Sequence, residues 1–146
     1  MTEEHAAGPD PRHRPPEGLG DELVEALGTL SKALETVERA RGRLYDFHQL
    51  MGGADLTLGK AVDQLRQAGA RAEADALERE IVGRNVLPGM WTFQIVEVYD
   101  DSYYRPFSDL ERQVRERLAD GRRHLYEARM KEERRTPGHP DHTARP

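Results

Sequence analysis

The sequence predicts an all-α protein, an antiparallel helical bundle of three to four helices. Charged residues make up 34% of the chain and hydrophobic residues 36%, a balance typical of long helices that each have a solvated face. Apolar side chains recur every three to four positions through most of the chain, which is the period of one helix face. This pattern does not indicate a thick sheet core.

The two ends of the chain differ in composition from its middle. Residues 1–19 and 136–146 are rich in proline, glycine and charge, so they bury too little apolar surface to offset the entropy of ordering. We predict two disordered arms there, around one helical domain at residues 20–135. Four of the six histidines lie in these arms, where a solvated polar role is the ordinary interpretation.

Composition argues against several classes of function. The chain has no cysteine, which removes disulfides, thiolate nucleophiles and zinc–thiolate sites. A net charge of -5 argues against nucleic-acid binding, which needs a surplus of Lys and Arg. No apolar run approaches the roughly 18 residues of a membrane helix and no signal peptide is recognisable, so we expect a cytoplasmic protein without membrane contact. Because standard enzyme motifs are missing, no catalytic residue, metal or cofactor is predicted.

The first helix is the clearest element of the sequence. It begins at Asp21, whose side chain suits an N-cap, and is expected to stop at Gly52-Gly53. Its apolar positions alternate in steps of four and three, as in a coiled coil. This stripe consists of Leu23, Leu27, Leu30, Leu34, Val37, Arg41, Leu44, His48 and Met51.

Two members of this stripe, Arg41 and His48, are polar. A polar residue in a helix seam costs stability, so it either specifies a partner or lines a polar cavity. Ala40 and Phe47 lie beside these two residues and would carry the stripe if it drifted at about 3.6 residues per turn. The sequence leaves both interpretations open.

Residues 57–84 are predicted to form two short helices or one kinked helix. Gly69 is the expected cap of the first part, because glycine adopts the left-handed conformation at helix ends without strain. The linker after Gly52-Gly53 is only a few residues long, so this segment is expected to fold back antiparallel on the first helix. Pro88-Gly89 then forms a turn.

The segment WTFQIVEVYDDSYYRPF, residues 91–107, holds six of the nine aromatic residues. As a strand, residues 91–99 would lack a clean polar face and a partner strand, so a helix is predicted. Asp100 and Asp101 then lie at its C-terminal end, where negative charge opposes the helix dipole. Either the helix frays there, or a cation or arginine compensates.

A last helix is predicted after Arg105-Pro106, which is expected to break or kink the chain because proline lacks an N–H donor. Ser108 and Glu111 form a capping-box pattern that predicts the start of this helix. The apolar spacing continues through Gly121 to Ala128. The glycine either admits a close neighbour or breaks the helix.

A carboxylate–histidine pocket is the sharpest hypothesis for a ligand site. Gln94, Glu97 and Asp101 share a helix face, at a spacing that helical bundles use for ligands. The Glu-x-x-His pair of bundle metal sites is absent, however. The other interpretation is that the acids pair with arginines such as Arg41. The pocket would consist of His48 with Glu97, Asp100 or Asp101, closed by Tyr103 or Tyr104.

Aromatic residues supply candidate interface anchors. Tyr103 and Tyr104 are adjacent and cannot both point inward from a helix, so one of them is a candidate contact residue. Trp91 is interpreted mainly as part of the core. The full set of predicted binding residues is Arg41, His48, Trp91, Gln94, Glu97, Asp101, Tyr103 and Tyr104.

The runs LYDFHQLMGGADLTLGKAVDQLRQAG, ADALEREIVGRNVLPGMWTFQIVE and YDDSYYRPF resemble a family of small uncharacterised helical proteins of high-GC actinobacteria. The resemblance covers most of residues 21–135 and leaves both arms outside. It implies no activity, because that family has no assigned function or active residues.

The leading functional prediction is a non-enzymatic helical-bundle interaction protein. It would self-associate or bind a partner helix, so the expected partner is a protein or a second copy of the chain. The contact surface would combine the stripe of the first helix with residues 91–107. The alternative is a helical bundle that binds a small molecule or a metal at a site centred on His48 and Glu97/Asp101. This alternative includes an enzyme.

Overall fold

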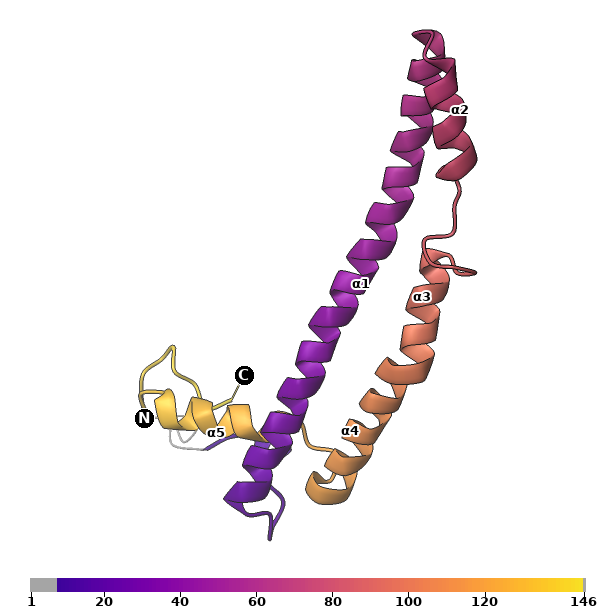
Figure 1. Cartoon of the computed structure of the whole chain (residues 1–146). Coiled ribbons are helices and arrows are strands. Elements are labelled where there is room, and N and C mark those ends of the chain that lie inside the picture. The colour runs from indigo at the N-terminus through magenta and orange to yellow at the C-terminus, as the bar shows by residue number, and fades with distance from the viewer. Residues whose placement is uncertain (1–7, 146) are drawn as a thin grey trace. The chain divides into compact units, whose positions relative to one another are not determined.

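The chain is all-α, an antiparallel helical bundle, in a computed structural model that describes residues 8–145 (Figure 1). No strand occurs among these residues, which confirms the predicted fold class. Residues 1–7 of the predicted N-terminal arm and the last residue of the tail lie outside the described range. The elements are η2 Pro11–His13, α1 Asp21–Gln67, α2 Arg71–Glu80, α3 Thr92–Tyr99, η3 Asp100–Tyr104, α4 Arg105–Ala119 and α5 Leu125–Arg134.

The chain divides into two compact units. Unit 2 is the continuous segment Val37–Arg105, and unit 1 combines the residues before it with those after it. The helix α1 therefore supplies its first part to unit 1 and the rest to unit 2.

The predicted end of the first helix at Gly52-Gly53 is wrong, because α1 continues to Gln67. Neither glycine adopts a positive φ, and the hydroxyl of Thr57 donates a hydrogen bond to the Gly53 carbonyl across the next turn. A glycine inside a helix costs about 1 kcal/mol relative to alanine. That cost does not end a helix when both flanks are good helix formers.

Gly69 caps α1, as the sequence predicts. Its φ is 89°. The Ala70 N–H donates to the Leu65 carbonyl at 2.8 Å and the Gly69 N–H to the Arg66 carbonyl at 3.1 Å. These two bonds make a Schellman motif, which satisfies the last carbonyls of the helix. The residues expected to begin the returning segment, 57–67, therefore belong to α1, and only α2 turns back after the cap.

The turn at Pro88-Gly89 and the helix after it are both confirmed. Gly89 has a φ of 72°, and the Met90 N–H donates to the Leu87 carbonyl at 3.0 Å. The helix α3 starts at Thr92.

Of the two outcomes predicted at Arg105-Pro106, a break or a kink, the break does not occur, because α3, η3 and α4 follow one another without interruption. The segment η3 is a π-helical turn, and the Arg105 N–H bonds to the Asp100 carbonyl, five residues back. An α-helix would push the proline ring against the carbonyl four residues earlier. The wider turn takes up one extra residue and displaces that carbonyl, so the helix passes through Pro106.

The capping box predicted at Ser108 does not form, because Ser108 lies inside α4. The Glu111 carboxylate instead accepts a hydrogen bond from the Arg115 guanidinium at 3.0 Å. Gly121, with a φ of 73°, ends the helix: its N–H donates to the Arg115 carbonyl at 3.1 Å. Of the two interpretations of this glycine, the helix break is therefore confirmed, and α5 is a separate helix.

Unit 1 has a small apolar core. Val24 of α1, Ala119 of α4 and Leu125 of α5 are buried together. Leu19, Leu27 and Tyr126 pack against them.

Candidate functional site

One face of α1 in unit 2 is held by polar contacts. The Arg41 guanidinium donates two hydrogen bonds to the Asp100 carboxylate, at 2.7 and 2.9 Å. It also lies over the rings of Tyr45 and Tyr104, 5.2 and 5.1 Å from their centroids. The hydrogen bonds from Arg41 lower the pKa of Asp100 from its usual value, because they favour the charged carboxylate. Asp100 directly follows α3, where its negative charge opposes the helix dipole. The positive charge of Arg41 offsets that repulsion, as one of the two alternatives of the sequence analysis required.

Further contacts on this face show that the chain after α1 runs antiparallel to it. The Tyr104 hydroxyl donates to the Glu38 carboxylate, which raises the pKa of the tyrosine. Further along α1, Asp55 accepts a hydrogen bond from the Gly83 N–H at 2.8 Å. Arg66, near the end of α1, pairs with Asp75 and Glu78 of α2. As the residue number rises along α1, that of the partner falls, so these contacts fix the register between α1 and the returning chain.

His48 and the acids of α3 do not converge. The imidazole Nδ1 of His48 lies 2.7 Å from the Thr92 hydroxyl, whereas Asp100 binds Arg41 and Asp101 pairs with Arg105 at 2.9 Å. Within residues 8–145, no group of three or more His, Asp or Glu side chains is placed to hold a metal ion.

The remaining predicted binding residues lie mostly on the outside of α3 and η3. Gln94 accepts a hydrogen bond from the Trp91 N–H at 3.0 Å and so caps α3. Trp91 is 57% exposed rather than part of the core. Glu97 and Tyr103 are exposed, and the Tyr103 ring stacks on Tyr99 at 5.8 Å. Of the adjacent tyrosines, Tyr104 makes the contact with α1.

A continuous apolar stripe runs along α1 at the edge of this contacting face. Within unit 2, apolar residues follow a strict three-four spacing, with a large residue at every seventh position and mostly alanine between. Ala40, Phe47 and Ala54 are exposed, Phe47 to 41%, whereas the other six residues are part-buried. We call this set the α1 seam. It consists of Val37, Ala40, Leu44, Phe47, Met51, Ala54, Leu58, Ala61 and Leu65.

The stripe predicted from the sequence is the side of α1 that packs on the rest of the chain in unit 2. Arg41 and His48 contact Asp100 and Thr92, and the stripe residues Val37, Leu44 and Met51 are part-buried beside them. The α1 seam shares these large residues and has alanine or Phe47 in place of the polar positions; Ala40 and Phe47 are the residues that the sequence analysis gave as the alternative. Small residues are ordinary at helix contacts where backbones approach closely.

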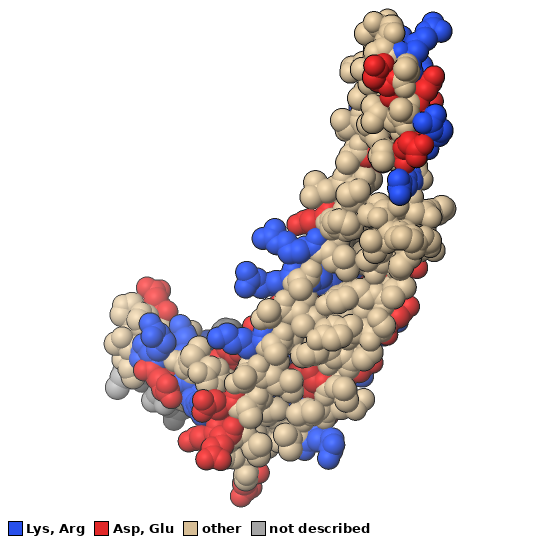
Figure 2. All heavy atoms as spheres, viewed as in Figure 1, with Lys and Arg blue, Asp and Glu red and all other residues tan. Residues whose placement is uncertain are grey.

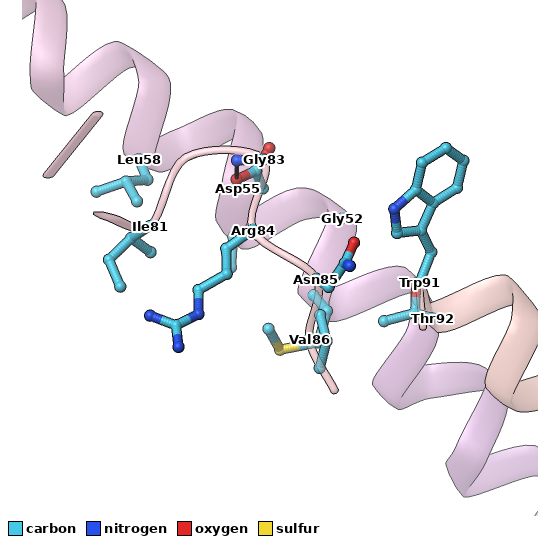
Figure 3. Close-up of a pocket in the computed structure, with 12 residues that line it drawn as sticks. Gly52, Asp55, Leu58, Ile81, Gly83, Arg84, Asn85, Val86, Trp91 and Thr92 are labelled. Atoms are coloured by element: carbon cyan, nitrogen blue, oxygen red, sulfur yellow. Dashed lines mark hydrogen bonds between the residues drawn. The ribbon is translucent and has the colours of Figure 1, made fainter. Parts of the chain in front are cut away.

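A groove of about 470 Å³ lies beside the middle of the seam (Figure 3). One wall is α1, including Met51, Ala54 and Leu58, and the other is the linker that follows α2. In the close-up, the indole of Trp91 points away from the Arg84 side chain. The groove is open and mainly apolar, so it suits aliphatic side chains better than a polar substrate.

The space-filling view shows a broad area without charged side chains where α1 and α3 lie beside each other, with basic residues along one edge (Figure 2). Large apolar side chains are well exposed in this unit, including Leu50 at 71% and Val98 at 53%. Exposed apolar surface on this scale usually marks an interaction site.

No protein-family model, no curated protein and no solved structure matches the chain. The resemblance to actinobacterial proteins therefore stays a prediction. Among the described helices, none combines the length and the apolar character needed to cross a bilayer.

Proposed function

We propose that this chain is a non-enzymatic interaction protein that binds another helix along the α1 seam. The observation that carries the proposal is the seam itself: a strictly spaced apolar stripe of four heptads in which Ala40, Phe47 and Ala54 are exposed and the other residues are only part-buried. A stripe of this kind is stable in water when a second helix covers it.

The small interior of the chain supports the same conclusion. Among the described residues, the largest fully buried side chains are Val24 and Val62. Burying apolar surface contributes about 25 cal/mol per Å², so a structure with few buried side chains gains little from its own core. Covering the seam would add the burial of Phe47, Met51 and their neighbours.

The alternative, a ligand-binding or metal-binding bundle centred on His48 and Glu97/Asp101, has less support. His48 is engaged with Thr92, and Asp101 with Arg105. The groove beside the seam is mainly apolar, and neither His48 nor Glu97 nor Asp101 lines it.

Replacing Phe47 with glutamate tests the proposal by placing a charge in the centre of the seam. The matched control is Leu56→Glu, because Leu56 is 73% exposed on the same helix but lies outside the seam. Fully burying a Phe contributes about 1.5–3 kcal/mol, so Phe47→Glu is expected to weaken association by about 10- to 100-fold. Leu56→Glu is expected to leave association near the wild-type level.

Sedimentation equilibrium across a wide concentration range measures this difference. Binding of an apolar dye to each chain at low concentration reports the uncovered seam. A wild-type chain that stays monomeric at millimolar concentration, and binds no more dye than Phe47→Glu, contradicts the proposal.

A further inference from the structure

We propose that the groove between α1 and the linker after α2 binds a small aliphatic carboxylic acid, with Arg84 holding the carboxylate. The residues that line this groove all belong to unit 2. The inference goes beyond the proposed function, because it does not require that the α1 seam binds a helix. It adds a ligand site and the chemical class of the ligand.

The groove has the size and the lining of a small-molecule site. Its volume of about 470 Å³ lies within the range of about 300–1,000 Å³ that is usual for such sites. Met51 and Leu58 line it from α1, and Ile81 and Val86 line it from the segment after α2 (Figure 3). These four side chains are apolar, so the body of a ligand that fills the space is expected to be apolar as well.

The wall that carries Arg84 is fixed by hydrogen bonds of the chain itself. The Gly83 N–H donates to the Asp55 carboxylate of α1 at 2.8 Å. The Arg84 N–H donates to the Ile81 carbonyl at 2.9 Å and closes a turn in which Gly83 has a φ of 70°. The groove is therefore formed before a ligand enters, which lowers the entropic cost of binding.

Arg84 supplies a cation that has no counter-charge in the chain. Within residues 8–145, its guanidinium pairs with no carboxylate; its Nη1 only approaches the Glu80 carbonyl, at 3.5 Å, which is long for a hydrogen bond. In the close-up, the Arg84 side chain extends away from Asp55 (Figure 3). A free guanidinium beside apolar side chains favours a ligand that combines a negative charge with an aliphatic chain.

The charges of the groove favour a carboxylate over a phosphate. A single guanidinium offers a planar pair of donors that matches the two oxygens of one carboxylate. A phosphate group carries about 1.5 to 2 negative charges at neutral pH. Of the described residues that line the groove, only Arg84 is a cation, and Asp55 adds a negative charge. A phosphate would thus leave excess negative charge, whereas a carboxylate leaves none beside Arg84.

Titration calorimetry with octanoate and with octanol tests the role of the charge. The two ligands share the same aliphatic chain, and only octanoate carries a carboxylate. Arg84→Gln is expected to shift the ratio of their dissociation constants by about fivefold in favour of octanol, because a partly exposed ion pair is lost. Arg71→Gln is the matched control, since Arg71 is exposed on α2 and lies outside the groove. It should leave the ratio unchanged.

Methyl NMR spectra locate the aliphatic chain of the ligand. The chain contains two isoleucines, Ile81 and Ile95, and of these Ile81 lines the groove. Octanoate is expected to shift the δ1-methyl resonance of Ile81 in a saturable way and to leave that of Ile95 in place. Each CH₂ added to the acid should strengthen binding by up to about fourfold for as long as the added group still lies in the groove.

Three results would overturn the inference. They are the absence of saturable octanoate binding, an unshifted Ile81 methyl resonance, and a ratio of dissociation constants that Arg84→Gln changes no more than Arg71→Gln does. None of these results bears on the proposed function, which sedimentation of the wild-type and Phe47→Glu chains decides without any ligand. A monomeric wild-type chain that binds octanoate would likewise contradict the proposed function alone.

Discussion

Unit 1 and unit 2 use the same long helix in different ways. In unit 1, α1 packs through apolar residues, with Val24 buried against Ala119 and Leu125. In unit 2, polar pairs such as Arg41 with Asp100 align α1 with the returning chain, Val62 and Val96 are buried, and other large apolar side chains such as Leu50 stay exposed. The first arrangement is complete within one chain. The second leaves Phe47 and Leu50 exposed.

This difference shows that two kinds of contact along one helix have different effects: polar pairs set the register, and apolar burial supplies most of the stability. Polar pairs set the register of a helical hairpin but contribute modestly to stability, because much of their energy replaces bonds to water. Apolar burial contributes more and is not directional. Unit 2 thus fixes the register of its helices with specific polar contacts, while apolar side chains such as Leu50 and Leu56 remain exposed.

The apolar packing of unit 1 predicts the largest effect on folding within one chain. Gly28 lies against Tyr126, and an added Cβ would sit 2.7 Å from the tyrosine Cβ. Gly28→Ala is therefore expected to destabilise the chain by about 1–3 kcal/mol, because α5 must move away from α1. Hydrogen exchange should become faster in Leu125–Arg134.

Gly42 provides the matched control, since it lies on the same helix and a Cβ there meets nothing within 4 Å. Gly42→Ala is expected to stabilise the chain by about 0.5–1 kcal/mol. Equal effects of the two substitutions in urea denaturation would show that the approach of Tyr126 to Gly28 is unimportant.

The polar contacts of unit 2 predict a smaller effect that depends on pH. Asp100→Asn keeps the size of the side chain but removes the charge that accepts two hydrogen bonds from Arg41. We expect a loss of about 1–2 kcal/mol at neutral pH. Self-association of any protein adds a concentration-dependent term to its stability, so the comparison is made at several concentrations of each chain.

The pH dependence follows from the lowered pKa of Asp100. A carboxyl whose pKa is lower in the folded state stabilises the fold above the pKa of the unfolded state, about 3.9 for Asp. That contribution disappears as the pH falls through the folded-state value. Urea denaturation should show the difference between the two chains at pH 7 and lose it under strongly acidic conditions. A difference that persists unchanged in acid contradicts this account.

The sequence predicted the class of fold better than the lengths of its elements. The caps and turns with glycine at positive φ were correctly placed at Gly69 and Gly89, because that backbone conformation is costly for other residues. The errors at Gly52-Gly53 and at Pro106 share one physical reason. Relative to alanine, a glycine inside a helix costs about 1 kcal/mol and a proline about 3 kcal/mol. Packing along a long helix, or a π-helical turn before the proline, can offset these costs, so the helix continues.

The candidate site was predicted only in part. Arg41 and Asp100 were recognised as residues in need of a counter-charge, and the structure pairs them. The partner of His48 could not be deduced, since the order of helices around a bundle is not set by their periodicity. The sequence left open whether the stripe of α1 runs through Arg41 and His48 or through Ala40 and Phe47; the structure places Arg41 and His48 against the returning chain and leaves Ala40 and Phe47 exposed.

The contact between His48 and Thr92 predicts the smallest effect. Thr92→Val removes the hydroxyl 2.7 Å from the imidazole Nδ1 but keeps the β-branched shape of the side chain. A loss of about 1 kcal/mol is expected, since one hydrogen bond between partly buried groups disappears. Thr36→Val is the control, because its exposed hydroxyl donates only to the Lys32 carbonyl within α1, and exposed substitutions usually change stability by less than about 0.5 kcal/mol. The His48 ring resonances in NMR spectra should shift in Thr92→Val and not in Thr36→Val; unchanged resonances in both would mean that the hydroxyl and the imidazole do not interact in solution.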